Sequence, residues 1–348
     1  MTGTRTFDHG GGVRSVRVPI PDNPLGHTLV YVVDTDRGPV LVDTGWDDPA
    51  SWDALVAGLA ERGSGVHEVY GVVITHHHPD HHGLSGRVRE VSGAWIALHA
   101  ADAAIVRRTR ETRAERWFTY MAAKLTAAGA PEEHIAPLRA PRRGAALPGS
   151  SPALPDREIA PGELLDLPGR RLRAIWTPGH TPGHVCLHLE EEHPAQPHGR
   201  LPGHGRLFSG DHLLPEITPH IGLYEDPDDA TVTDPLGDYL DSLERVARLA
   251  PAEVLPAHQY AFGDAAARVR QLLDHHEDRL TALLSLLSTP HTPWQLAERM
   301  RWNRPWKDIP HGSRTIAVSE AEAHLRHLVK QGRAEPVAGS DPVSYAAV

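Results

Sequence analysis

Apolar runs alternate with helical patterns along the first three quarters of the chain. Leu29–Val33 and Val40–Asp43 flank a turn that contains Gly38, which predicts a β-hairpin. Val69–Thr75 is a mostly apolar run and predicts a buried strand, and Ser92–His99 predicts the next one. Helical patterns occur between and after these runs. This order favours sheets with helices packed on their outer faces.

A second group of β-like runs follows a stretch without periodicity. Residues 141–162 are rich in Pro, Gly, Arg and Ser and predict a loop. Strand patterns then occur at 171–176, 185–191 and 206–211. Apolar residues recur on one face of Thr233–Leu249, which predicts a helix.

The character of the chain changes near residue 263. Residues 263–288 form a long helical pattern. In residues 289–348 two helical patterns precede a Gly-containing turn and two short β-like runs, which is the outline of a winged-helix-like module. The sequence therefore predicts a main domain over 1–262, a connecting helix over 263–288 and a small C-terminal module over 289–348.

Composition and charge narrow the class of protein. The chain has 348 residues, of which 40% are hydrophobic, and a formal charge of −10, which argues against nucleic-acid binding as its main task. Cys186 is the single cysteine, so no disulfide can form within the chain. No long apolar run or secretory pattern is visible, so we expect a cytoplasmic protein without a membrane partner. A small-molecule substrate is expected, and homodimerisation is left open.

The stretch THHHPDHHG, residues 75–83, concentrates imidazole and carboxylate groups at the end of a predicted strand. Residues two apart on a strand point the same way, so His76 and His78 project together. Pro79 suits the turn before a helix, and Asp80 and His81 can then aim at an adjacent point. With 25 histidines in the chain, this run alone is a moderate signal for a metal site.

Four further polar residues follow apolar runs, where loops can line a cleft. They are Asp43 in LVDTG, His180 in TPGHTPGH, Asp211 in LFSGD and His258 in LPAH. Scattered histidines arise by chance in a histidine-rich chain, but these five motifs in this order do not readily arise by chance. The second histidine of the Gly/Pro turn, His184, is predicted to be a buried partner rather than a ligand.

These motifs, in this order, resemble those of the metallo-β-lactamase superfamily, particularly the hydrolase branch that includes glyoxalase II. The resemblance covers roughly residues 13–262 and implies an α/β fold, a four-layer αβ/βα sandwich with the site at one edge of two sheets. The C-terminal module resembles the winged-helix-like appendage of some members. The resemblance also implies that His76, His78 and His180 hold one metal ion and that Asp80, His81 and His258 hold the second. It further implies that Asp211 bridges the two ions and that Asp43 supports the site.

Imidazole and carboxylate ligands without a thiolate suit two divalent metal ions, with Zn²⁺ expected and Fe or Mn open. Two such ions about 3.5–4 Å apart can share a water and lower its pKa toward about 7, which gives a bridging hydroxide as nucleophile. Asp80 or Asp211 could carry a proton to the leaving group. We therefore expect hydrolysis of a thioester, ester or lactone. Trp46, Tyr224 and Tyr260 are candidates for the substrate pocket.

Two other functions stay open on the sequence. Persulfide dioxygenases share the His-x-His-x-Asp-His pattern and the HTPGH motif but use a single iron with fewer ligands, and the presence of His258 favours two metals. An RNase Z-like phosphodiesterase is disfavoured by the net negative charge. The ligands set the hydrolytic chemistry, while loops set the substrate, so the substrate itself is not predicted.

Overall fold

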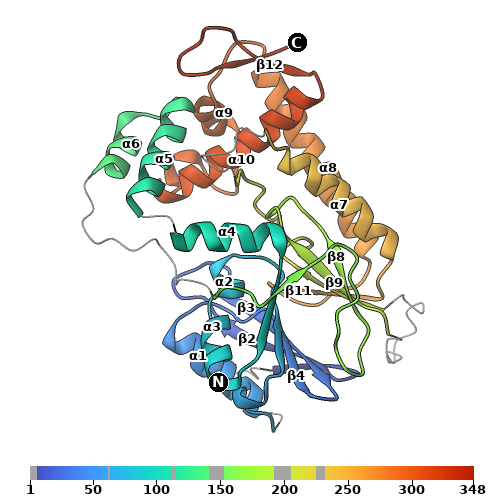
Figure 1. Ribbon diagram of the computed structural model, residues 1–348. Coiled ribbons are helices and arrows are strands. Elements are labelled where there is room, and N and C mark those ends of the chain that lie inside the picture. Colours follow the sequence, from blue (N-terminus) through green and yellow to red (C-terminus); the bar gives the residue numbers. More distant parts are fainter. Residues whose placement is uncertain (1–5, 62, 112–113, 141–152, 192–204, 225–231) are drawn as a thin grey trace. The chain divides into compact units, whose positions relative to one another are not determined.

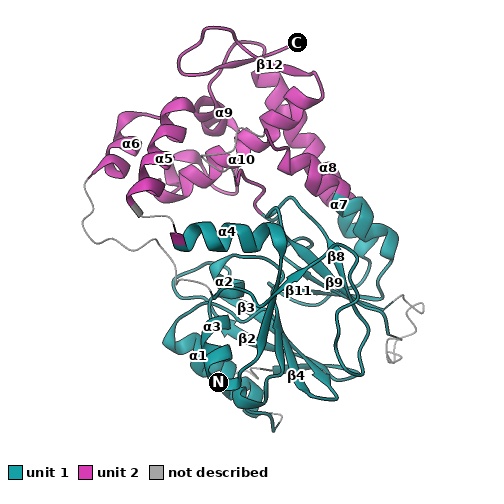
Figure 2. Ribbon diagram, in the orientation of Figure 1, with its two compact units in different colours: residues 1–110, 148–219, 242–269 teal, residues 111–147, 220–241, 270–348 magenta. Residues whose placement is uncertain are grey.

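The fold comes from a computed structural model of the chain (Figure 1). It describes residues 6–61, 63–111, 114–140, 153–191, 205–224 and 232–348. The chain divides into two compact units, shown in different colours in Figure 2. Unit 1 consists of Met1–Arg110, Pro148–Pro219 and Ser242–Val269, and unit 2 consists of Glu111–Leu147, His220–Asp241 and Arg270–Val348. The domain boundaries predicted at residues 262 and 288 rest on the sequence pattern and stay a prediction.

Unit 1 contains a seven-stranded sheet whose strands follow the order of the chain. Its strands are β1 (Thr6–Gly10), β2 (Val13–Pro19), β3 (His27–Thr35), β4 (Gly38–Val42), β5 (Gly71–Val73), β6 (Trp95–His99) and β7 (Arg157–Ile159). The strands from β1 to β4 pair antiparallel and those from β4 to β7 pair parallel. The predicted β3–β4 hairpin is confirmed. Of the loop predicted over 141–162, residues 141–152 lie outside the described residues, and the prediction is wrong at β7, which pairs with β6.

A four-stranded sheet completes the β-structure of unit 1, in the order β11-β10-β9-β8. Its strands are β8 (Leu172–Trp176), β9 (Val185–Leu189), β10 (Arg206–Gly210) and β11 (Glu253–Pro256). β8 and β10 both pair antiparallel with β9, and β11 pairs parallel with β10. β8, β10 and β11 therefore run in the same direction.

Two apolar clusters hold the layers of unit 1 together. One lies between the sheets, where Tyr31, Val42 and Val73 meet Leu187 and Phe208. The other packs the outer face of the larger sheet against α1 (Pro49–Ala60), α3 (Ser85–Ser92) and α4 (Ala100–Glu111). The helices shield one face of the larger sheet because that face carries a continuous set of Val, Leu and Ile side chains.

The fourth layer comes from α7 (Pro235–Leu249). In the part of α7 that belongs to unit 1, Leu243 and Val246 are fully buried. Ser242 Oγ donates to the carbonyl oxygen of Pro178 at 3.0 Å, which fixes the helix beside the end of β8. Helix, sheet, sheet and helix follow one another, so the expected four-layer αβ/βα sandwich is confirmed.

Unit 2 is mainly helical. It contains α5 (Ala114–Ala127), α6 (Glu132–Arg139), most of α8 (Ala265–Leu286), α9 (Pro293–Arg299), α10 (His311–Lys330) and a hairpin of β12 (Ala334–Pro336) and β13 (Tyr345–Ala347). The order α9, α10, hairpin agrees with the pattern read from the sequence, and the winged-helix comparison stays a prediction. Among the helices within the described ranges, none combines the length and apolarity needed to cross a bilayer.

Polar side chains meet inside unit 2 between α8 and α10. His276 Nδ1 lies 3.1 Å from His324 Nε2, and Arg279 Nη2 lies 2.9 Å from Glu320 Oε1. His324 Nδ1 donates to the backbone oxygen of Glu320, so its Nε2 is the acceptor toward His276. His276 and His324 are buried. We call these four residues the α8–α10 polar cluster.

Candidate metal centre

The predicted site residues lie at one edge of the two sheets of unit 1. They follow β4, β5, β8, β10 and β11, as Asp43, His76, His180, Asp211 and His258 respectively. β4 runs parallel to β5, and β10 runs parallel to β11. Carboxyl ends of parallel strands meet at the same edge of a sheet, so the loops that carry these side chains converge there.

Three histidines bring their ring nitrogens together and form the first triad. His76 Nε2 lies 3.0 Å from His78 Nδ1, and His180 Nε2 lies 3.1 Å from the same His78 atom. All three nitrogens lie within 4.8 Å of one another. His76 and His180 are buried, so the ring nitrogens face one another away from bulk water.

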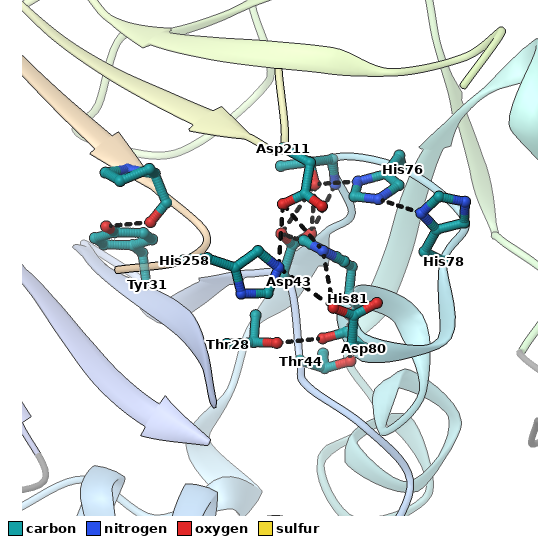
Figure 3. A network of polar contacts seen from close by, with 12 residues as sticks. Thr28, Tyr31, Asp43, Thr44, His76, His78, Asp80, His81, Asp211 and His258 are labelled. Carbon is teal, nitrogen blue, oxygen red and sulfur yellow. Dashed lines mark hydrogen bonds and ion pairs between the residues drawn. The ribbon is translucent and has the colours of Figure 1, made fainter. Parts of the chain in front are cut away.

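Asp80, His81 and His258 form the second triad (Figure 3). Asp80 and His81 lie on the short helix α2 (Pro79–His82), which begins immediately after the first triad's His78. His258 Nε2 lies 3.3 Å from Asp80 Oδ2, and His81 Nε2 lies 3.5 Å from the same oxygen. The Pro79 ring sets the helical φ angle at the first position of α2, which turns the chain from one triad to the other.

Asp211 lies between the triads, with one carboxylate oxygen toward each. Its Oδ1 is 3.2 Å from His258 Nε2 and 3.4 Å from His81 Nε2. Its Oδ2 is 3.5 Å from His180 Nε2. This is the placement that a carboxylate bridging two cations requires, and it agrees with the role expected for Asp211.

Two further contacts fix the orientation of the second triad. His81 Nδ1 donates to Asp43 Oδ2 at 2.8 Å, and His258 Nδ1 donates to the carbonyl oxygen of His27 at 3.0 Å. With Nδ1 occupied, Nε2 of each ring is directed into the site. Asp43 has a φ of 62° and also accepts from the backbone nitrogen of Thr75 at 2.8 Å. The position of Asp43 therefore agrees with its predicted supporting role.

Comparison with known proteins assigns the family. The model of the metallo-beta-lactamase superfamily matches residues 23–195. A crystal structure of a metallo-beta-lactamase family protein from Thermus thermophilus is 32% identical, with a TM-score of 0.77, and the match covers 97% of this chain and 99% of that one. This chain belongs to the metallo-β-lactamase superfamily. The resemblance to the superfamily is thereby confirmed, while the glyoxalase II-like branch stays a prediction.

Two other superfamily relatives differ in how much of their length is matched. A beta-lactamase domain protein from Burkholderia ambifaria is 26% identical, with a TM-score of 0.71, over 99% of this chain and 95% of its own. The lactamase-like protein adaB of Aspergillus niger is 26% identical over 264 residues, which are 76% of this chain and 59% of adaB. The matched part of this chain thus spans about three fifths of that curated relative.

Burial and charge give the two triads of this superfamily site different protonation. Burial, together with the neighbouring imidazoles, lowers the pKa of His76 and of His78 well below the ordinary value. Burial acts in the same direction on His258, but Asp211 and Asp80 outweigh it and raise the pKa of His258 to about 10. His76 and His78 are therefore neutral, which is the form that binds a metal, and His258 carries a proton that a divalent cation can replace.

The carboxylates of Asp80, in the second triad, and of Asp211, between the triads, stay ionised. Burial opposes ionisation of Asp80 and Asp211, but the neighbouring imidazoles His81 and His258 hold the pKa of each carboxyl below its usual range. The same carboxylates raise the pKa of His81 well above its usual value against the opposing effect of burial. The negative charge is thus concentrated where cations would be bound.

The residues present fit a pair of divalent cations. His81 Nε2, His258 Nε2 and Asp211 Oδ1 are buried and have no hydrogen-bond partner among the described residues. Buried polar atoms almost always form hydrogen bonds, whereas these three meet only in ion-pair contacts of 3.2 and 3.4 Å. Their convergence indicates a place for a cation. Nitrogen and oxygen ligands in this arrangement suit Zn²⁺, Fe or Mn.

Three aromatic residues are expected to line a substrate pocket, and their surroundings differ. Tyr260 follows the site histidine His258, is 49% exposed and donates to Glu216 Oε1 at 2.6 Å. Trp46 is half-buried in unit 1, and Tyr224 is half-buried in unit 2. A pocket role for these three aromatic residues stays a prediction.

His184 has a position that the sequence indicated only in part. It is buried, as expected for a partner within the Gly/Pro turn. Its Nε2 accepts from the backbone nitrogen of Asp211 at 3.2 Å, and its Nδ1 donates to Thr177 Oγ1 at 2.8 Å. His184 therefore holds the strand end that carries Asp211. The repeated spacing in TPGHTPGH signalled an ordered turn but not the strand end that it contacts.

Proposed function

We propose that this chain is a dinuclear metal-dependent hydrolase that acts on a small ester-type bond, a thioester, ester or lactone. The observation that carries the proposal is the pair of triads that share Asp211, each oxygen of which faces a different triad. Zn²⁺ is the expected ion, with Fe or Mn as the other ions that this ligand set suits.

The chain's own residues have distinct tasks in this proposal. Two bound divalent ions would acidify a water molecule and polarise a carbonyl oxygen. The side chain of Asp80 is 16% exposed, whereas that of its neighbour His81 is fully buried. Asp80 is thus a part of the site that substrate can reach, and with Asp211 it is the group proposed to pass a proton to the leaving group.

The second triad is what favours this function over a single-iron oxidoreductase. His258, which follows β11, completes that triad with Asp80 and His81. A mononuclear site would leave these three side chains, two of them buried, converging without a ligand. The formal charge of −10 continues to disfavour a phosphodiesterase that binds nucleic acid.

The proposal is tested by elemental analysis of the purified full chain together with a panel of thioesters, esters and lactones. His76→Ala and Asp211→Ala should each lower bound metal and reduce hydrolysis by at least about a hundredfold. His67→Ala is the matched control, because His67 is exposed on the η1 turn (Val66–Glu68) and should leave both unchanged.

Two results would count against the proposal. A folded wild-type protein that takes up no transition ion would exclude metal-dependent hydrolysis. One iron per chain with oxygen uptake on a persulfide, and no hydrolysis in the panel, would instead support the oxidoreductase alternative.

A further inference from the structure

Asp102 is a buried carboxylate in the first turn of α4 that accepts hydrogen bonds from two separate loops. Its Oδ2 accepts from the backbone nitrogen of His77 at 2.8 Å and from His77 Nδ1 at 3.0 Å. The same oxygen accepts from Thr181 Oγ1 at 2.8 Å, and Oδ1 accepts from the backbone nitrogen of Gly183 at 2.6 Å. One carboxylate thus joins residues that are far apart in the sequence.

The partners of Asp102 are the sequence neighbours of the first triad. His77 lies between His76 and His78, and Thr181 follows His180. Fixing these neighbours fixes the backbone from which all three imidazoles of the first triad project. The two loops follow strands of different sheets, and a backbone hydrogen bond from Val185 to Thr75 at 2.9 Å joins the segments next to them. Asp102 adds side-chain contacts with both loops themselves.

The packing around Asp102 leaves little freedom in the second loop. A Cβ atom at Gly183 would lie 2.5 Å from the backbone nitrogen of Asp102 and 2.6 Å from its Oδ1. Only glycine lets the loop come this close to the carboxylate. The loop that carries His180 is therefore held against α4 at a distance set by this contact.

A fully buried carboxylate is unfavourable unless it is well hydrogen-bonded, and an apolar side chain could fill the same space. Asp102 meets the requirement with donors drawn from both ligand loops. We propose that Asp102 is a positioning residue that sets the spacing of the first triad, His76, His78 and His180, by joining the two loops that carry it. This inference rests on the proposed metal-dependent function.

The test measures Zn²⁺ affinity at each triad separately in the full chain, by competition with a chromophoric chelator. The His258→Ala background removes a ligand of the second triad, so it measures Zn²⁺ affinity at the first triad. The His180→Ala background removes a ligand of the first triad and measures affinity at the second. Asp102→Asn keeps the shape but places a donor amide opposite at least one N–H. It should weaken Zn²⁺ binding about 10–100-fold in the His258→Ala background and less than about threefold in the other.

Two comparison variants separate positioning from general destabilisation. Asp43→Asn should weaken the second triad more than the first, because Asp43 contacts His81 directly and reaches His76 only through Thr75. Asp156→Asn also removes a carboxylate that accepts a backbone N–H, from Ile96 at 2.9 Å, but it lies outside the site and should leave both affinities unchanged.

A milder variant covers the case in which Asp102→Asn does not fold. Thr181→Val is nearly isosteric and removes one donor to Asp102, and it should weaken only the first triad, by several-fold. The thermal unfolding midpoint of each metal-free variant verifies that the protein compared is folded.

The outcomes separate this inference from the proposed function. Equal affinity of wild type and the Asp102→Asn or Thr181→Val variant at the first triad would overturn the positioning role alone. Equal weakening of both triads would also overturn it, because that is the result of a merely structural role. Wild-type protein that binds no Zn²⁺ would overturn the proposed function and, with it, this inference.

Discussion

The contact between Asp43 and His81 offers the sharpest test of how the site is built. Asp43 Oδ2 accepts from His81 Nδ1 at 2.8 Å, and Asp43 Oδ1 accepts from the backbone nitrogen of Thr75 at 2.8 Å. In Asp43→Asn one of these two acceptors becomes a donor amide. If the oxygen stays toward Thr75, the amide faces His81 Nδ1 and favours the tautomer with hydrogen on Nε2. That hydrogen would block the atom that points into the second triad.

Asparagine is the informative replacement at position 43. The φ of 62° is a left-handed conformation that asparagine tolerates better than alanine, so backbone strain does not confuse the result. Loss of a carboxylate that orients a ligand histidine lowers metal affinity by about 10–100-fold, which corresponds to about 1.4–2.8 kcal/mol. Asp43 reaches the first triad only indirectly, because Thr75 Oγ1 donates to Asp43 Oδ2 at 2.9 Å and lies 3.1 Å from His76 Nδ1. The first triad should therefore lose less affinity than the second.

The assay is Zn²⁺ competition in the His180→Ala background, which leaves the second triad intact. We expect Asp43→Asn to weaken binding there and Asp156→Asn, a carboxylate outside the site, to have no effect. The pH should be held at about 7.5 or above in all samples, because protons compete with the metal for imidazole. Stoichiometry is read from elemental analysis after dialysis.

The reasoning would be refuted if Asp43→Asn bound Zn²⁺ at the second triad within about twofold of its parent. It would also fail if the variant lost affinity equally in the His258→Ala background, which reports the first triad. Either result would mean that the His81 tautomer does not control the second triad.

Two predictions concern stability. Tyr31 Oη donates to the carbonyl oxygen of Pro256 at 2.8 Å between the two sheets, so Tyr31→Phe should lower the free energy of unfolding by about 1–3 kcal/mol, while the exposed contact of Tyr70 makes Tyr70→Phe a neutral control in thermal unfolding. Burial lowers the pKa of His324 in the α8–α10 polar cluster from 6.5 to about 4, against the opposing charge of Glu320. The unfolded chain therefore binds more protons between these values, and the contribution of His324 to stability is complete above about pH 6.5 and is lost toward about pH 4. His324→Gln should reduce the loss of the thermal midpoint between about pH 7 and pH 5, and an unchanged pH dependence would contradict this.

Much of the fold could be read from the chain because the apolar periods of strands and helices are local. The β3–β4 hairpin and the helix α7 were predicted from residues that are neighbours in the sequence. The short edge strand β7 was missed, since its pairing with β6 depends on a partner far away in the chain. The first two strands, β1 and β2, also received no prediction.

The sequence by itself determined the family and the set of side chains in the candidate metal centre, because His-x-His-x-Asp-His and the strand-end residues are local patterns. The tertiary structure decided which groups orient them. Nothing in the local sequence around Asp102 distinguishes it from a surface residue of a helix, yet the fold buries it between the loops of His77 and Thr181. Likewise, only the meeting of the two sheets places Asp211 with an oxygen toward each triad. Hydrogen bonds between distant segments depend on the packed arrangement, so a pattern along the chain cannot specify them.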